Sequence, residues 1–318
     1  MQTLKEMKKF NFRDYIVYIS FVVVFLVFSV LLFDKGFLLP SNLMNILRQT
    51  SMISVAAVGM TFAISAGLID LSTGGVTAMS ALTAALMLKN YGSIFLAVLA
   101  ALAVGLVCGT INGTIISKVR IPAFLVTLGT SAVFSGISRL MTNLEAVPIS
   151  NQLFNNIFGS GNVGPISSLF IWTIVVTIIG HIYYKKTSYG RALLAVGGNE
   201  PAARYSGIKT DRVKMRAMII CSLCAAFAGI LYAGRTHGAR YTLGESDNMN
   251  IIASVVIGGT SFSGGKGTII GTIIGSLVIG MLNNGLLLMG LTVSEQMIAR
   301  GIVIIIAVSL SLREAKDE

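Results

Sequence analysis

The chain has 318 residues, of which 54% are hydrophobic and only 12% are charged, and its mean hydropathy is +0.81. A soluble domain carries about twice that proportion of charged residues, so the composition excludes a soluble enzyme and a separate soluble domain. We therefore expect one all-α integral membrane domain over residues 1–318. The net charge of +11 has to be placed along the chain before it can indicate a partner.

The N-terminal segment, residues 1–14, is basic and leads into an apolar run from Tyr15 to Phe33. No small-x-small cleavage site follows this run, and it is longer than the apolar core of a signal peptide. We therefore predict a basic cytoplasmic segment followed by an uncleaved first transmembrane helix.

Nine further apolar runs follow, and a helix of about 20 residues is enough to cross the hydrocarbon core. They cover Ser51–Ile69, Ser72–Leu88, Ser93–Ser117, Pro122–Met141, Ile166–Tyr184, Val213–Ala233, Asn250–Gly259, Thr268–Met289 and Ser294–Leu312. The run Asn250–Gly259 is too short to span alone, so it is expected to be re-entrant, or tilted and continued by the residues after it. The sequence thus predicts about ten transmembrane helices, with short or broken helices near 70–75 and 250–267.

The positions of the basic residues predict the orientation of these helices. With the N-terminus in the cytoplasm and ten crossings, 17 of the 24 Lys and Arg residues fall inside and 6 outside, while Arg300 lies within the last run. This bias follows the positive-inside rule and places both termini in the cytoplasm. The basic charge is therefore topological, and no nucleic-acid partner is needed to explain it.

A glycine-rich stretch, GGTSFSGGKGT from Gly258 to Thr268, resembles a phosphate-binding loop only superficially. Such a loop has Ser or Thr directly after its Lys, whereas Gly267 follows Lys266 here. The stretch aligns instead with GLIDLSTGGVT, from Gly67 to Thr77, at an offset of 191 residues. Duplicated, glycine-interrupted apolar segments are typical of transporters whose broken helices line a pathway, although small residues also serve helix packing.

Few polar side chains lie within the predicted spans. We expect Asp70 to cap the N-terminus of the third helix, to act as a polar gate, or to do both. Asparagines on membrane helices more often form interhelical hydrogen bonds than line a path. The candidates for a translocation path or gate are Asp70, Ser72, Asn112, Thr127, Ser263, Asn283, Asn284 and Arg300.

No set of residues for catalysis or metal binding emerges. His181 and His237 have no Cys or carboxylate at ligand spacing, and the Cys221–Cys224 pair in an apolar run fits packing better than redox or metal chemistry. A proton-coupled carrier usually needs several buried ionisable groups, and this chain has one good candidate, Asp70. The sequence therefore favours a non-enzymatic transport protein whose energy comes from another subunit.

Three loops are candidate partner surfaces. The loops 142–165 and 235–249 are predicted to be extracytoplasmic, and 185–216 to be cytoplasmic and strongly basic. Within the basic loop we predict a short helix from Asn199 to Tyr205, with Asn199 as N-cap, Pro201 in the first turn and Gly207 as the stop. A short helix of this kind can seat in a groove of a partner protein.

The residues EPAARYSG, from Glu200 to Gly207, resemble the Glu-Ala-Ala-x3-Gly coupling motif of ATP-binding-cassette (ABC) importer permeases. The I-x-L-P ending of the longer motif is absent, since AMII stands at Ala217–Ile220. The resemblance is to the ribose-type subfamily and covers almost the whole chain. It includes Gly59–Ser80, Ile121–Thr130, Tyr189–Ile208 and Ile251–Thr268 in the family's order.

This resemblance implies the membrane subunit of a bacterial inner-membrane importer for a monosaccharide. It implies an ABC ATPase that holds ATP and magnesium, an extracytoplasmic sugar-binding protein and a second permease subunit as partners, with no cofactor on this chain. The implied coupling residues are Asn199, Glu200, Ala202, Ala203, Arg204, Gly207 and Ile208. The candidate docking residues for the binding protein are Arg139, Glu145, Arg235, Arg240, Glu245 and Asp247. Nucleosides, branched-chain amino acids and sugar-like signal molecules remain alternative cargoes, and a stand-alone carrier or channel is the alternative mechanism.

Overall fold

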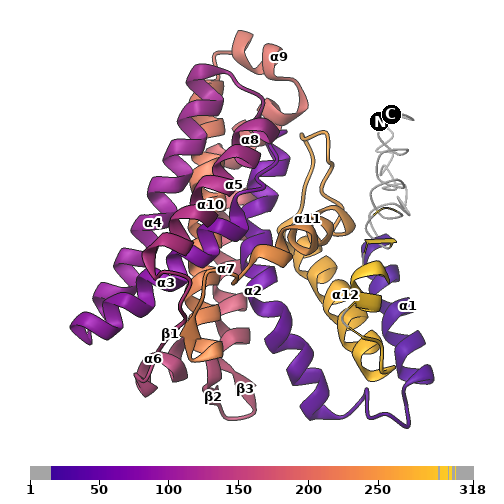
Figure 1. Ribbon diagram of the computed structural model, residues 1–318. Coiled ribbons are helices and arrows are strands. Elements are labelled where there is room, and N and C mark those ends of the chain that lie inside the picture. The colour runs from indigo at the N-terminus through magenta and orange to yellow at the C-terminus, as the bar shows by residue number, and fades with distance from the viewer. Residues whose placement is uncertain (1–15, 293, 300, 303–304, 306–318) are drawn as a thin grey trace, which may run out of the picture.

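The computed structural model describes residues 16–292, 294–299, 301–302 and 305, and within them the protein is a bundle of long helices (Figure 1). The predicted cytoplasmic segment 1–14 and most of the predicted last span, Ser294–Leu312, lie outside the described residues. The longer helices are α1 (Ile16–Leu31), α2 (Pro40–Ser65), α3 (Thr73–Tyr91), α4 (Ile94–Thr114), α5 (Ala123–Met141), α7 (Ser168–Lys186), α10 (Thr210–Thr236) and α12 (Ile269–Leu288).

Six of these helices are long and apolar enough to cross a membrane, namely α2, α5, α7, α10, α12 and α4 with its π-helical continuation η2 (Ile115–Val119). The 16-residue α1 is a shorter apolar helix, and the hydroxyl-rich α3 matches the predicted third span. The expectation of an all-α membrane protein is confirmed at this level.

The second span differs most from its predicted boundaries. The second span was expected over Ser51–Ile69, but α2 begins at Pro40 and ends at Ser65. Pro40 provides a favourable first helical residue, which allows the helix to start within the polar sequence before Ser51. The eighth apolar run is the ten-residue α11 (Asn248–Ile257), which is short as expected.

Helix α10 lies at the centre of the main bundle and packs closely on its neighbours. Glycines on α4 let the two backbones approach, since a Cβ added at Gly105 or Gly109 would lie 2.7 Å from backbone atoms of α10. On the other side, a Cβ at Gly229 of α10 would lie 2.4 Å from the Thr77 carbonyl oxygen of α3. Small residues at helix interfaces are the usual means of close packing in a membrane protein.

Helices α1 and α12 form a second layer with the first half of α2, visible at one side of Figure 1. The Asn42 and Asn284 side chains exchange two hydrogen bonds there, with N–O distances of 3.0 Å and 2.9 Å. The expected interhelical role of Asn284 is therefore confirmed. Asn283 is half-buried, and its Oδ1 has no hydrogen-bond partner among the described residues.

Short elements close the two ends of the bundle, and they lie at opposite ends of Figure 1. One end carries α8 (Ser188–Gly198) and α9 (Glu200–Tyr205). The other carries β1 (Val147–Pro148), paired with β4 (Gly238–Ala239), and β2 (Asn162–Val163), paired with β3 (Ile166–Ser167). It also holds α6 (Gln152–Asn155), the π-helix η3 (Asn156–Ser160) and the 3-10 helix η4 (Glu245–Asp247).

Candidate coupling helix and broken membrane segments

The short helix α9 forms where the sequence predicts it. Asn199 is its N-cap, and the side-chain oxygen of Asn199 accepts a hydrogen bond from the Ala202 N–H at 3.0 Å. Gly207 ends the helix with φ +84°, a conformation that costs glycine little. The Ile208 N–H then bonds back to the Ala203 carbonyl at 3.0 Å, as at many glycine-terminated helix ends.

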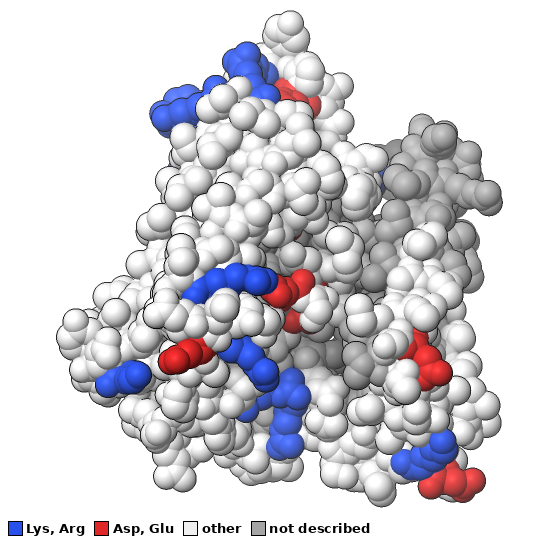
Figure 2. All heavy atoms as spheres, viewed as in Figure 1, with Lys and Arg blue, Asp and Glu red and all other residues white. Residues whose placement is uncertain are grey.

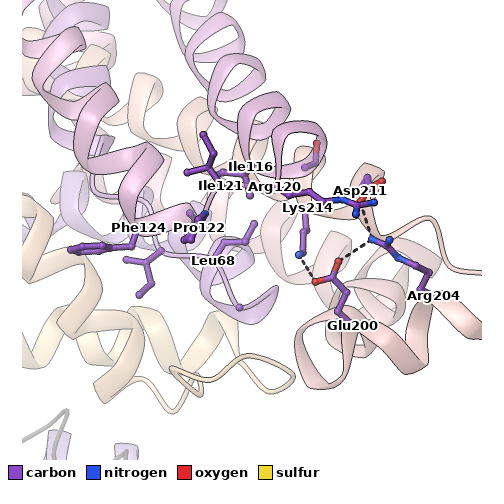
Figure 3. Close-up of a pocket in the computed structure, with 14 residues that line it drawn as sticks. Leu68, Ile116, Arg120, Ile121, Pro122, Phe124, Glu200, Arg204, Asp211 and Lys214 are labelled. Atoms are coloured by element: carbon purple, nitrogen blue, oxygen red, sulfur yellow. Dashed lines mark hydrogen bonds and ion pairs between the residues drawn. The ribbon is translucent and has the colours of Figure 1, made fainter.

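Ion pairs tie α9 to the start of α10. Arg204 contacts Glu200 at 3.2 Å and Asp211 at 3.1 Å, and it also donates to Thr210 Oγ1 at 2.8 Å. Lys214 donates to the other carboxylate oxygen of Glu200 (Figure 3). Each pair is partly exposed and weak alone, so the orientation of α9 depends on the network as a whole.

The acidity of Glu200 reflects these contacts. Partial burial acts to raise the pKa of the Glu200 carboxyl group, but the hydrogen bond and charge of Lys214, with help from Thr210 and Arg204, outweigh it and hold the pKa below its usual value. Glu200 is therefore an anion at neutral pH. The sequence identified Glu200 and Arg204, but it did not identify Lys214, which lies beyond the motif on the next helix.

A pocket of about 520 Å³ opens between α9 and the membrane bundle (Figure 3). One wall is the ion-pair network of Glu200 and Lys214. Another wall is formed by Arg120, in the turn after η2, and by Phe124, at the start of α5. The floor is the chain just after α2, at Gly67–Ile69. The pocket therefore connects the coupling helix with the first break in the membrane helices.

The two glycine-rich segments that echo each other in sequence are neighbours in space. The Gly265 N–H donates to the Ser65 carbonyl, the last residue of α2, at 3.0 Å. A Cβ added at Gly264 would lie 2.9 Å from the Gly67 backbone nitrogen and 2.7 Å from the Gly197 carbonyl oxygen of α8. We call this meeting of Ser65, Gly67, Gly197, Gly264 and Gly265 the glycine junction. The chain that leads into α9 thus touches both broken segments.

The first break, residues 66–72, is fixed at its far end by a residue that the sequence did not single out. The Asn248 side-chain oxygen accepts from the Gly74 N–H at 2.8 Å and from Thr73 Oγ1 at 2.6 Å, and its amide donates to the Leu71 carbonyl at 2.8 Å. Asn248 is the first residue of α11, so it joins the two broken segments.

The prediction that Asp70 caps α3 is wrong, because another residue binds the free N–H group there. Asp70 was expected to bind the free N–H groups of the first turn, but Asn248 binds the Gly74 N–H, and Ser72 occupies the N-cap position without a side-chain cap bond. Asp70 instead accepts from the backbone N–H of Ser72 at 2.8 Å and from its hydroxyl at 2.6 Å. The cap comes from 174 residues away in the chain, where local sequence rules do not reach.

Four of the predicted path residues gather at the first break. Asn112 donates from α4 to Ser72 Oγ at 2.8 Å, and Ser72 binds Asp70. Thr127 Oγ1 donates from α5 to the Ile69 carbonyl at 3.0 Å. The other predicted path residues lie elsewhere: Ser263 is exposed in the glycine-rich loop, Asn283 and Asn284 are on α12, and Arg300 is outside the described residues.

The predicted docking residues lie at the end of the bundle opposite α9. The β1–β4 pairing brings loop 142–165 and loop 235–249 together, with Val147 opposite Ala239. Arg139 pairs with Glu245 at 3.0 Å and covers the Tyr241 ring at 5.0 Å. Asp247 accepts a hydrogen bond from Tyr232, Glu145 and Arg240 are exposed, and Arg235 is half-buried.

The charged side chains have a simple distribution over the face shown in Figure 2. They gather at the α9 end and over the lower half of that face, with uncharged surface between the two groups. An uncharged surface around long apolar helices suits contact with lipid, whereas both ends suit contact with water or a partner.

Comparison with protein-family models decides the family. Residues 42–308 match the model described as a branched-chain amino acid transport system / permease component. The chain belongs to this permease family. The permease is also similar over most of its length to curated relatives, and it is a multi-pass protein of the bacterial inner membrane.

Three of these relatives are named as sugar permeases. The ribose import permease protein of Bacillus subtilis (strain 168) is 39% identical over 91% of this chain and 90% of its own. The D-allose transport system permease protein of Escherichia coli (strain K12) is 34% identical over 96% and 94%. The galactose/methyl galactoside import permease protein of the same strain is 32% identical over 98% and 100%. Comparison with solved structures found no match.

Proposed function

We propose that the protein is the membrane permease subunit of an ATP-driven monosaccharide importer. The observation that carries this proposal is the capped, ion-paired helix α9 in a permease-family chain whose relatives are named for ribose, allose and galactose. ATP and magnesium belong to a partner ATPase, and this chain is a transport subunit that catalyses no reaction of its own.

Ten spans with both termini in the cytoplasm are the topology that best fits this role. The helix α9 and the paired outer loops lie at opposite ends of the bundle (Figure 1). The basic loop would then face the ATPase, and loops 142–165 and 235–249 would face the sugar-binding protein. The short α11 with its glycine-rich continuation, residues 258–268, serves as the eighth crossing.

Coupling runs from α9 through the glycine junction to the first break. An ATPase that moves Glu200 and Arg204 also moves α8, because only Asn199 separates the two helices. Gly197 of α8 lies against Ser65 and Gly265, so a displacement of α8 reaches the end of α2 through backbone contact. Tightly packed junctions of this kind shift between discrete arrangements and do not deform gradually.

The polar groups at the first break favour an uncharged solute. Hydroxyl and amide side chains of Ser72, Thr127 and Asn112 surround it, and Asp70 is its only ionisable carboxyl group within the described residues. A charged amino acid would favour fixed charges or exposed helix termini along its path. This argument supports a neutral polyol, and hence a sugar, over the amino-acid cargo in the family's description.

An assembly with three kinds of partner follows from this role. The ATPase would bind around Asn199–Ile208, and the sugar-binding protein would bind near Arg139, Glu245 and Arg240. A second permease subunit would complete the membrane part, because such importers pair two membrane subunits. Lipid surrounds the exposed apolar helices, and no nucleic acid takes part.

Uptake in reconstituted vesicles tests the proposal. The permease is reconstituted with its partner ATPase and sugar-binding protein, and labelled ribose, allose and galactose are supplied with and without ATP inside the vesicles. Unlabelled sugars, leucine and uridine serve as competitors. Sugar uptake that requires ATP and is blocked only by sugars supports the proposal, whereas uptake that leucine or uridine blocks more strongly than any unlabelled sugar would reject it.

A further inference from the structure

The buried polar group around Asp70 contains acceptor atoms that have no hydrogen-bond partner. Asp70 and Asn112 both have 0% exposure. Asp70 Oδ2 and Asn112 Oδ1 have no hydrogen-bond partner of good geometry among the described residues, and the Cys221 thiol that faces Asp70 is only a weak donor. Ser72 Oγ bridges the two side chains, since it accepts from Asn112 Nδ2 at 2.8 Å and donates to Asp70 Oδ1 at 2.6 Å. Two unsatisfied acceptors therefore lie on neighbouring side chains, which is costly away from water.

Among the described residues, no positively charged side chain pairs with Asp70. The titratable groups that face it are the thiols of Cys221 on α10 and Cys108 on α4. The polar groups that hold the same segment are Thr127 of α5 and Asn248 of α11, both uncharged.

The hydrogen bonds already distinguish the two oxygens of the carboxyl group. Oδ1 accepts two hydrogen bonds, from the Ser72 N–H and from the Ser72 hydroxyl, as a carbonyl oxygen does. Oδ2 has no partner of good geometry among the described residues, and the facing Cys221 thiol is a weak donor. A proton on Oδ2 would remove the buried charge and would turn an unsatisfied acceptor into a donor.

We propose that Asp70 is a proton-binding site, with the proton held on Oδ2 in this conformation and released when residues 66–72 become hydrated. A hard metal cation fits the site poorly, because two thiols face the carboxyl group and such cations prefer oxygen ligands. In the described conformation, in which Asp70 is fully buried and which we call the closed break, the bound proton leaves this segment electrically neutral.

This site makes the closed break sensitive to pH. The closed form binds one more proton than a hydrated form, so acid conditions favour the closed break and alkaline conditions favour the hydrated one. The cysteine thiols that face Asp70 do not reverse the direction of this pH dependence. A thiol that loses its proton becomes an anion, and a neighbouring anion opposes ionisation of the Asp70 carboxyl group.

Infrared spectroscopy of the purified full-length protein in lipid tests the proposal. We expect the carbonyl stretching band of a protonated carboxylic acid to persist from mildly acidic to mildly alkaline pH in the wild type. Asp70→Asn should lose this band completely. The matched control Asp34→Asn, which changes an exposed aspartate before α2, should keep it.

A second variant keeps the test decisive if Asp70→Asn does not fold. Ser72→Ala removes the hydroxyl that donates to Oδ1, so the band should remain but move to higher frequency as its carbonyl loses a hydrogen bond. Absorption only from ionised carboxylates at neutral pH in the wild type would overturn the proposal. A protonated-acid band that neither the Asp70 nor the Ser72 substitution changes would overturn it equally.

Discussion

Gly265 donates its backbone N–H to the Ser65 carbonyl at 3.0 Å and thereby joins the glycine-rich loop after α11 to the end of α2. Gly197 of α8 lies against both residues, because a Cβ added to it would be 1.9 Å from the Ser65 oxygen and 2.6 Å from the Gly265 nitrogen. Three segments that are far apart in the sequence therefore meet without any side chain between their backbones.

The first prediction concerns this contact. Gly197→Ala should separate α8 from Ser65 and reduce ATP-driven uptake strongly, because backbone atoms have to move to make room for the methyl group. Overpacking of this kind costs about 1–3 kcal/mol. Gly136→Ala on α5 is the matched control, since a Cβ there meets nothing within 4 Å. Uptake is measured in vesicles at equal amounts of inserted protein, and equal uptake by the two variants would contradict the coupling path.

The second prediction concerns the cap of the coupling helix. Asn199→Ala removes the acceptor for the Ala202 N–H and should destabilise α9 by about 1 kcal/mol. Faster hydrogen exchange at residues 202–206 and reduced uptake should follow. Asn199→Asp keeps a capping oxygen and should restore both properties. If the Ala variant exchanges no faster than the wild type, the cap does not hold α9.

The third prediction concerns the charge of Glu200. Its lowered pKa means that the folded protein keeps Glu200 ionised at pH values where an ordinary glutamate begins to take up a proton. The ion pairs with Lys214 and Arg204 therefore contribute fully above the ordinary glutamate pKa and are lost only as pH falls through the lowered pKa.

Glu200→Gln tests this sign. The variant should reduce the binding of the ATPase at neutral pH, and the difference from the wild type should shrink only as the pH falls through the lowered pKa of Glu200, where the wild-type carboxyl group also becomes neutral. Glu145→Gln, on an exposed loop at the other end, is the control. A difference that grows as the pH falls would show that the assigned sign is wrong.

The fourth prediction concerns Asn248. Asn248→Ala leaves the Gly74 N–H, the Thr73 hydroxyl and the Leu71 carbonyl without their partner, and unsatisfied buried groups cost about 1–3 kcal/mol. The midpoint of thermal unfolding in detergent should fall. Asn90→Ala, at an exposed site near the end of α3, should leave it unchanged. Equal midpoints would mean that Asn248 does not fix the break.

Local signals in the sequence predicted α9 well. An N-cap asparagine, a proline in the first turn and a glycine stop act over a few residues, and Asn199, Pro201 and Gly207 all take those roles. The apolar runs likewise predicted most of the long helices. These runs could not set the start of α2, because residues 40–50 mix polar and apolar residues and their helical conformation depends on packing against α12 and α1.

Long-range contacts were beyond the same reasoning. Asn248 caps α3 from 174 residues away, and Lys214 completes the pair with Glu200 from the next helix. The offset between the two glycine-rich segments did indicate that they are related, but only the fold shows that Gly265 touches Ser65. For Asp70 the sequence indicated a polar role but did not identify its partner, Ser72. The same local sequence is compatible with a helix cap and with a turn in which Asp70 binds Ser72.

Purification from the native membrane tests the central claim most directly. The tagged chain is extracted gently, and the proteins that remain bound to it are identified and quantified. Our account predicts an ABC ATPase in a stoichiometric amount, and it predicts that Glu200→Ala combined with Gly207→Leu removes this ATPase while membrane insertion stays intact. A chain that purifies alone and moves solute in vesicles without ATP would contradict the account.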